Sequence, residues 1–136
     1  RAAGELAEKK GFRLNLEPLN TEVDHAGYFL SSPADGIAIV KELGLDSVKM
    51  LYDICHMGIM GGNLTAFIEN NIKWIGHFHI AGIPGRHEPY EGETNYPFIL
   101  RKIDQAGYDG FLGLEYIPLL PCPETLLKTR EYLTQK

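Results

Sequence analysis

Three carboxylates and one imidazole stand in or just after four apolar segments of this 136-residue sequence. Glu17 follows FRLNL, Asp53 follows SVKMLY, His79 lies within WIGHFHI and Glu115 follows FLGL. Like charges brought together away from water are costly unless a cation neutralises them. Oxygen ligands with one imidazole nitrogen suit Mn²⁺, Mg²⁺ or Co²⁺, and Zn²⁺ is also compatible. We therefore predict a divalent metal ion here, with Mn²⁺ or Mg²⁺ first; the alternative is four strand-end polar residues that hydrogen-bond to loops.

Helical and strand-like segments alternate along the whole chain. Residues 31–44, for example, offer a serine cap and Pro33 at one end and Gly44 at the other, as helices do. Such alternation gives parallel strands joined by right-handed helical crossovers. We expect strands at residues 12–20, 47–53, 74–82 and 111–116, and helices at 2–10, 31–44, 63–74, 96–107 and 123–136.

Alternate residues of each expected strand point to opposite faces of the sheet. One face is apolar, as with Val48, Met50 and Tyr52, and suits a covering layer of helices. The other face turns polar toward the carboxyl end of each strand, where the four candidate ligands lie. An open sheet covered on both sides prefers two apolar faces, whereas a barrel of β/α units carries polar residues at its catalytic mouth. We therefore predict the α/β class and a (β/α)8 barrel, whose apolar face also contains Phe12, Leu14, Leu16, Trp74, Phe78, Ile80, Leu112, Leu114 and Tyr116.

The composition is that of an ordinary globular domain, with 44% hydrophobic and 23% charged residues. The net charge of -5 disfavours nucleic acid and anionic membranes as partners. We find no apolar run of the roughly 18 residues that a membrane span requires and no secretion signal. Two cysteines, Cys55 and Cys122, are too few for a disulfide framework, so we expect a cytoplasmic protein. The length fits a single domain over residues 1–136.

Several motifs resemble one known family. The segments LEPLN, LYDICHM, GHFHIAGIPGRHEPYEGETNYP and GYDGFLGLEYIP together resemble hydroxypyruvate isomerase. More broadly, they are similar to the xylose isomerase-like TIM barrels, which include ketose 3-epimerases and endonuclease IV. The resemblance covers residues 11–118 and only strands five to eight of that barrel. Such barrels need about 250 residues. The resemblance therefore implies that this chain supplies the last four β/α units and needs either the N-terminal half-barrel or a second copy in a homo-oligomer.

The resemblance also implies roles for the four candidate ligands. Glu17 and Glu115 match the pair that both binds the metal and moves the proton, so they are the expected catalytic residues. Asp53 matches the second carboxylate ligand, and His79 stands where the sugar epimerases place a ligand histidine. Several hydroxypyruvate isomerases have a glutamine at that position, which leaves the substrate open.

Two further residues match substrate contacts of the family. His56 resembles a contact to a substrate oxygen, and Arg86 resembles the residue that holds the polar end of the substrate. A planar guanidinium suits a carboxylate, so the expected partner is a small hydroxy-carbonyl compound. The implied reaction converts hydroxypyruvate to tartronate semialdehyde. The metal polarises the α C–H bond, one carboxylate removes the proton, and the other assists its delivery after a cis-enediolate forms.

Three other functions stay open. A ketose 3-epimerase would use the same metal and carboxylates on a free sugar. An endonuclease IV-like zinc phosphodiesterase would need several zinc ions and an Asp-x-His pair, where this sequence has Gly85, Arg86 and His87. The third is a non-catalytic half-barrel fragment that only binds metal.

Other polar residues near these motifs have structural interpretations. His77 shares the polar face of its strand and is expected to be a hydrogen-bonded interior residue. His87 and Glu88 are interpreted as solvated loop charges; the alternative is that they help to close the loop over the substrate. Asn20 is interpreted as a residue that orients the loop after Glu17.

Overall fold

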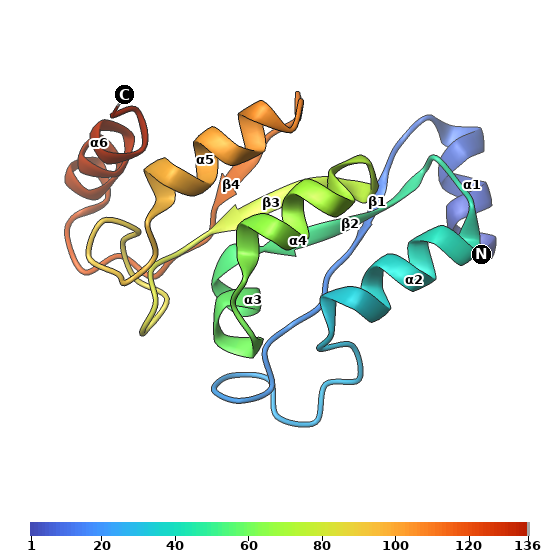
Figure 1. Cartoon of the computed structure of the whole chain (residues 1–136), viewed down its shortest axis with the longest axis horizontal. Helices are drawn as coiled ribbons and strands as arrows, with labels where there is room; N and C mark the ends of the chain where they lie inside the picture. Colours follow the sequence, from blue (N-terminus) through green and yellow to red (C-terminus); the bar gives the residue numbers. More distant parts are fainter. Residues whose placement is uncertain (136) are drawn as a thin grey trace.

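Four parallel strands lie side by side in sequence order at the centre of the protein (Figure 1). The computed structural model describes residues 1–135, so the last residue of the helix and of the domain expected to end at 136 lies outside the described residues. Pairing runs from β1 to β2, β2 to β3 and β3 to β4, and every pair is parallel. The α/β class and the parallel order of the strands are confirmed. The strands are β1 (Leu14–Leu16), β2 (Val48–Asp53), β3 (Ile75–Ile80) and β4 (Leu112–Leu114).

Helices connect the strands, and several of their ends are marked in the sequence. Ser32 caps α2 by accepting a hydrogen bond from the Asp35 amide, and the helix stops at Gly44, whose φ of 63° is left-handed. The Asn95 side chain caps α5 in the same way, through the Phe98 amide. The helices are α1 (Ala2–Lys10), α2 (Pro33–Leu43), α3 (Ile54–Met60), α4 (Leu64–Asn71), α5 (Tyr96–Gln105) and α6 (Cys122–Leu133), with a 3-10 turn η1 (Ile72–Trp74).

One face of the sheet is buried under helices. In Figure 1, α2, α4 and α5 lie in front of the sheet, on the same side of it. Met50 and Tyr52 of β2, with Phe78 and Ile80 of β3, are at most 1% exposed and lie in the core. This is the face that the alternation predicts to be apolar. Each fully buried side chain of this kind contributes roughly 1.5–3 kcal/mol, so the central strands anchor the fold.

The edges of the sheet depart from the predicted pattern. Phe12 lies outside β1 and is 50% exposed, and Leu114 of β4 is 42% exposed, although the alternation predicts both to be buried. Each edge strand has three residues and a neighbouring strand on one side only. Less of the sheet is therefore available to pack against them, and the predicted apolar face is wrong at these two positions.

One helix is absent from the sequence-based expectation. The segment between β2 and α4 carries α3, which begins directly after Asp53. Asp53 is both the last residue of β2 and the N-cap of α3, since its side chain accepts a hydrogen bond from the His56 amide. A cap that is also a strand residue gives no separate start signal, and seven residues are too few to show a clear helical period.

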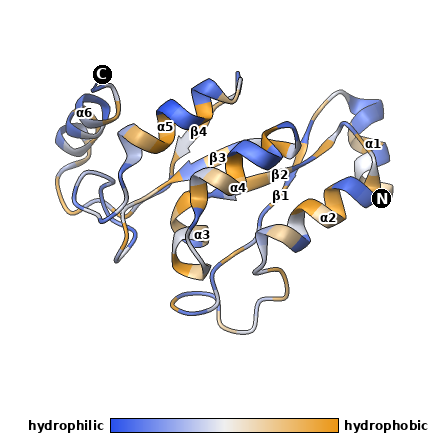
Figure 2. Cartoon of the chain, viewed as in Figure 1, coloured by the Kyte–Doolittle hydropathy of each residue, from blue (hydrophilic) through white to orange (hydrophobic). Residues whose placement is uncertain are grey.

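Hydropathy follows this arrangement (Figure 2). Apolar residues gather in the central strands and α3, whereas α1 and α6, at opposite ends of the view, are mostly hydrophilic. Across residues 1–135, no helix has the length and apolar character needed to cross a membrane.

Candidate active site

The four candidate ligands come together at the carboxyl end of the sheet. Asp53 ends β2, His79 lies in β3, and Glu17 and Glu115 follow β1 and β4 directly. Each offers one ligand atom, and these atoms all lie within 4.8 Å of one another. The structure therefore contains a group of three carboxylates and one imidazole that could hold a metal ion.

The register of the sheet explains this convergence. Asp53 pairs with His79, and His79 pairs with Gly113, so these three residues form one row across the sheet. A Cβ atom on Gly113 would lie 2.9 Å from Nε2 of His77 and 3.0 Å from Cδ2 of His79. The glycine leaves room for both imidazoles, and Glu115, two residues further on, supplies the carboxylate on this side.

Asp53 serves two purposes at once. Its side chain is fully buried. One oxygen, Oδ1, accepts a hydrogen bond from the His56 amide at 2.9 Å and so caps α3. The other, Oδ2, faces the cluster, 3.8 Å from Nδ1 of His79. The helix cap therefore orients the carboxylate toward the cluster.

The imidazole of His79 has an unused nitrogen inside the cluster. Its Nδ1 atom lies 3.0 Å from Oε2 of Glu115 and 3.7 Å from Oε1 of Glu17. This atom is buried and forms no hydrogen bond with any residue in the described range. A buried imidazole nitrogen beside three carboxylates is a donor set that fits a divalent cation.

Arg86 lies against the same carboxylates. Its Nη2 atom donates a hydrogen bond to Oδ2 of Asp53 at 2.6 Å and another to Oε2 of Glu115. Burial alone would lower the pKa of Arg86, but the charge of Asp53 and these hydrogen bonds raise it above its ordinary value. The guanidinium thus supplies the positive charge that the clustered carboxylates require.

His56 lies between two donor groups, the side-chain amide of Asn20 and the guanidinium of Arg86. The Asn20 carbonyl oxygen accepts hydrogen bonds from the amides of Val23 and Asp24, so its amide nitrogen faces the ring and donates to Nδ1 of His56 at 2.7 Å. Burial lowers the pKa of His56, against the opposing charge of Asp53. Nε2 of His56 lies 3.3 Å from Nη1 of Arg86, and a guanidinium nitrogen only donates, so both ring nitrogens of His56 face donor groups. Asn20 also orders the loop after Glu17, as predicted.

The surroundings of Glu17 change the pKa of its carboxyl group. Burial raises the pKa of Glu17, and the negative charges of Asp53 and Glu115 raise it further. It borders a cleft of about 510 Å³, which has room for a small substrate beside the cluster. The residues lining this cleft are Glu17, Leu19, Asp24, His25, His56, Arg86, Glu115, Tyr116 and Ile117.

Two further polar residues, His77 and Glu88, lie near the four candidate ligands. The ring of His77 meets that of His79 edge-on, with 5.1 Å between centroids, so it lies one layer deeper on the same face. Glu88 is 1% exposed, and its Oε1 atom accepts hydrogen bonds from the Leu119 and Leu120 amides and the Thr125 hydroxyl. The interpretation of Glu88 as a solvated charge is therefore wrong. Its partners lie more than 30 residues further along the chain, where no local pattern could reveal them.

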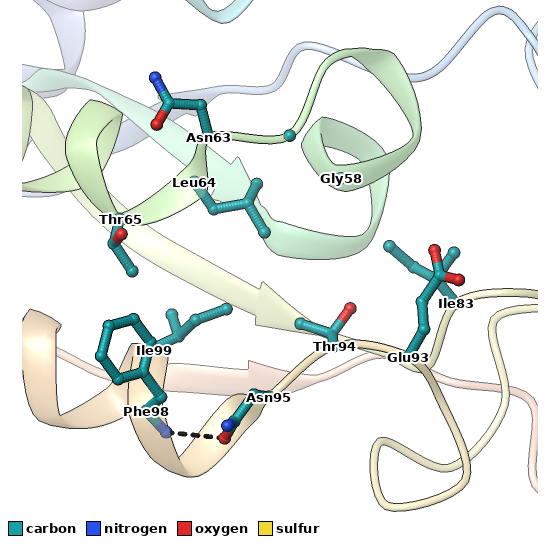
Figure 3. A pocket seen from close by; sticks show the side chains of 11 residues that line it. Gly58, Asn63, Leu64, Thr65, Ile83, Glu93, Thr94, Asn95, Phe98 and Ile99 are labelled. Carbon is teal, nitrogen blue, oxygen red and sulfur yellow. Dashed lines mark hydrogen bonds between the residues drawn. The ribbon is translucent and has the colours of Figure 1, made fainter.

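A second hollow lies between α4 and α5 (Figure 3). It measures about 530 Å³ and is bordered by apolar side chains such as Leu64, Ile83 and Phe98. Among the described residues that line it, Glu93 is the one titratable side chain. A metal or proton-transfer site needs more than one such group, so the chemistry belongs to the first cleft.

Proteins of known sequence resemble this chain over most of its length. A family model described as xylose isomerase-like TIM barrel matches residues 1–135. The 2-oxo-tetronate isomerase of Cupriavidus necator is 43% identical over 116 residues, which are 85% of this chain and 44% of that protein. A human protein with the provisional name hydroxypyruvate isomerase is 39% identical over 132 residues, 96% of this chain and 47% of that protein. The chain thus spans about half the length of the curated relatives it matches.

Solved structures also match most of this chain. A Brucella melitensis structure described as an AP endonuclease of family 2 is 35% identical, with a TM-score of 0.89, and the match covers 96% of this chain and 50% of that one. The 3-keto-D-glucoside 4-epimerase of E. coli is 26% identical, with a TM-score of 0.83 and the same coverage. From its parallel β/α units, its strand-end cluster and these matches, the chain belongs to the xylose isomerase-like TIM barrel family.

Proposed function

We propose that this chain provides the metal-binding and proton-transfer half of an isomerase that acts on a small hydroxy-carbonyl acid. Hydroxypyruvate, which would be converted to tartronate semialdehyde, and 2-oxo-tetronate are the substrates suggested by the names of its relatives. The observation that carries the proposal is the convergence of four ligand atoms within 4.8 Å, including an unused nitrogen of His79.

The residues divide into ligands and proton carriers. Glu17, Asp53, His79 and Glu115 would hold the ion. A divalent cation bound there would act as a Lewis acid that polarises the substrate carbonyl. Glu17 and Glu115 approach from opposite edge strands, so one would take the proton from the hydroxyl-bearing carbon while the other assists its return to the neighbouring carbon.

Two further side chains would position the substrate. His56 borders the cleft and would contact a substrate oxygen through Nε2, which lies 3.3 Å from Nη1 of Arg86. Arg86 borders the cleft, and its guanidinium would pair with the substrate carboxylate once the ion takes over the charge balance of Asp53 and Glu115.

This sheet supplies only half of the strands that a complete barrel requires. An eight-stranded barrel needs four strands more than this sheet has, supplied either by the N-terminal half of a barrel or by a second copy. We propose that residues 1–136 form one partial domain, that Mn²⁺ is the working ion, and that nucleic acid and membranes are not partners. Cys55 and Cys122 are unpaired, which supports a reducing compartment such as the cytoplasm.

The test follows proton exchange by NMR. Purified chain would be incubated with Mn²⁺ and hydroxypyruvate in D₂O, alone and mixed with the first half of the C. necator relative. Deuterium should enter the carbon next to the carbonyl, and exchange should stop with EDTA, with Glu17→Gln and with Glu115→Gln. Glu22→Gln, an exposed carboxylate of the same loop as Glu17, serves as the control that keeps exchange. Mn²⁺ binding without any exchange in either preparation would contradict the proposal.

Sugar epimerisation is the second candidate. The 3-keto-D-glucoside 4-epimerase of E. coli has a TM-score of 0.83 with this chain, and a D-psicose 3-epimerase has a TM-score of 0.74 at 28% identity. The same NMR assay with D-fructose as the substrate separates the two readings. A zinc phosphodiesterase is the weaker alternative, because the residues described at the site form one group of four ligands rather than a multi-zinc cluster.

A further inference from the structure

A buried carboxylate that the proposed reaction does not use lies in the loop between β3 and α5. Glu88 is 1% exposed, and its Oε1 atom accepts three hydrogen bonds. The donors are the Leu119 amide at 2.8 Å, the Leu120 amide at 3.3 Å and the Thr125 hydroxyl at 2.9 Å. All three belong to the segment after β4 or to α6. Glu88 therefore joins two connections that are far apart in the sequence and close in space.

The network continues from Glu88 toward the active site. A carboxylate only accepts, so the Thr125 hydroxyl donates to Glu88 and accepts in turn from the Tyr116 hydroxyl, 2.9 Å away. Tyr116 lines the cleft and follows Glu115 in the chain. One chain of hydrogen bonds thus runs from Glu88 to the residue next to a proposed proton carrier.

Two additional contacts tie the same connections together beside the cluster. The Ile117 amide donates to the carbonyl of Arg86 at 2.7 Å. The Nδ1–H of His87 donates to the carbonyl of Ile117 at 2.9 Å. These hydrogen bonds and those of Glu88 hold the loop that carries Arg86 against the segment that directly follows Glu115. Among the residues that form them, Glu88 has a fully buried side chain.

We propose that Glu88 is a positioning residue that sets the spacing between Arg86 and Glu115. The inference rests on the proposed function, in which Arg86 holds the substrate and Glu115 moves the proton. Neither side chain is anchored by its own strand: Arg86 lies in a loop with a left-handed φ of 55°, and Glu115 is 54% exposed after a three-residue edge strand. Without Glu88 the two connections would separate, and the substrate would sit away from the carboxylate that acts on it.

The test compares Glu88→Ala and Glu88→Gln with Ser47→Ala. Ser47 is a matched control, because its buried hydroxyl donates to the carbonyl of Gly4 at 2.7 Å, at the opposite end of the sheet. We expect Glu88→Ala to raise KM for hydroxypyruvate and to lower kcat, each about tenfold. Glu88→Gln should recover most of the loss, since its amide oxygen can accept the same three hydrogen bonds. Ser47→Ala should lower the melting temperature and leave both kinetic constants within about twofold of the wild type.

A second readout does not depend on the reaction. In Glu88→Ala, amide hydrogen exchange of Ile117 should quicken by about tenfold or more, whereas the Leu14 amide, which donates to the carbonyl of Ser47, should keep its protection. Thr125→Val, which removes one of the three donors and keeps the apolar volume, provides a milder variant if Glu88→Ala fails to fold. Unchanged Ile117 protection in both variants would overturn the proposal, even if the wild type shows no activity on hydroxypyruvate. Wild-type inactivity with faster Ile117 exchange would instead reject the proposed function alone.

Discussion

The two central strands and the two edge strands contribute to the cluster in different ways. Asp53 of β2 and His79 of β3 have side chains that are 0% and 17% exposed. Glu17 and Glu115, which follow the edge strands β1 and β4, are 28% and 54% exposed. The central pair lies behind a packed core, while the outer pair borders the open cleft.

This difference matches two chemical tasks. A ligand that holds an ion benefits from a rigid, desolvated position, which the core beneath β2 and β3 provides. A carboxylate that gains and loses a proton must reach the substrate and needs a pKa that its surroundings can move. Burial and neighbouring charges raise the pKa of Glu17 in this direction.

The largest loss of unfolding free energy is expected from Asp53→Ala. The substitution removes the cap of α3 and leaves Arg86 without its buried partner, which costs about 3 kcal/mol of unfolding free energy. Glu115→Ala, at the edge, should cost under about 1 kcal/mol because its ion pair with Arg86 is half exposed. Urea unfolding without metal measures both. Equal losses would remove the distinction between centre and edge.

Tyr96→Phe tests the anchoring of the central strand β3. The Tyr96 hydroxyl donates to the carbonyl of Ala81 at 2.6 Å and accepts from its amide, and both residues are fully buried. Loss of these bonds leaves two buried backbone groups unpaired, which should cost about 2 kcal/mol. Tyr108→Phe is the matched control near β4. Its one hydroxyl proton is shared between the carbonyls of Gly76, at 3.2 Å, and Phe111, at 3.0 Å, and Phe111 is exposed, so its loss should cost about 1 kcal/mol or less. A larger loss in the control would contradict the comparison.

A pH dependence should reveal the buried anchor of the edge strand β4. Burial alone would raise the pKa of Glu88, but the hydrogen bonds from its own amide and from Leu119, Thr125 and Leu120 outweigh it and lower the pKa below the ordinary value of 4.5. The stabilisation by Glu88 is therefore complete above pH 4.5 and is lost as the pH falls through its folded-state pKa. Unfolding measured from pH 7 to pH 3 should show a steeper acid loss in the wild type than in Glu88→Gln. Parallel curves for the two proteins would show that Glu88 does not supply this dependence.

The smallest effect is expected on the affinity for Mn²⁺ when the guanidinium of Arg86 is removed. Arg86→Met removes a guanidinium that occupies the carboxylates Asp53 and Glu115, so Mn²⁺ should bind a few-fold more tightly in the absence of substrate. Arg101→Met, an exposed arginine of α5, controls for net charge and should leave the affinity unchanged. Calorimetry measures both variants. Weaker binding in Arg86→Met would mean that Arg86 supports the ion rather than competing with it.

Much of this arrangement is readable from the sequence. The alternation within VKMLYD and GHFHI predicts which residues face the helices, and it places Asp53 and His79 on the opposite face. That reasoning succeeds because a central strand has neighbours on both sides and its side-chain period is two. It fails for Phe12 and Leu114, since an edge position can stay exposed whatever its polarity.

The wrong interpretation of Glu88 and the ion pairs of Arg86, which the sequence does not predict, have a common cause. Glu88 lies in a loop rich in charges, and its burial depends on donors in the Leu119–Thr125 region that local sequence cannot bring near. Arg86 contacts Asp53 and Glu115 from a backbone turn in which its φ is positive. Arginine rarely adopts a positive φ, so the residue type does not predict this turn. Local periodicity predicts strand faces, whereas contacts between loops depend on the whole fold.

The most direct test of the metal centre is a calorimetric titration of the chain with Mn²⁺, repeated for Asp53→Asn and Glu115→Gln. We predict one ion per wild-type chain, a loss of affinity of about 100-fold or more for the central substitution, and a smaller loss for the exposed edge residue. Absence of binding, or an affinity that neither substitution changes, would contradict the assignment of these residues as a metal centre.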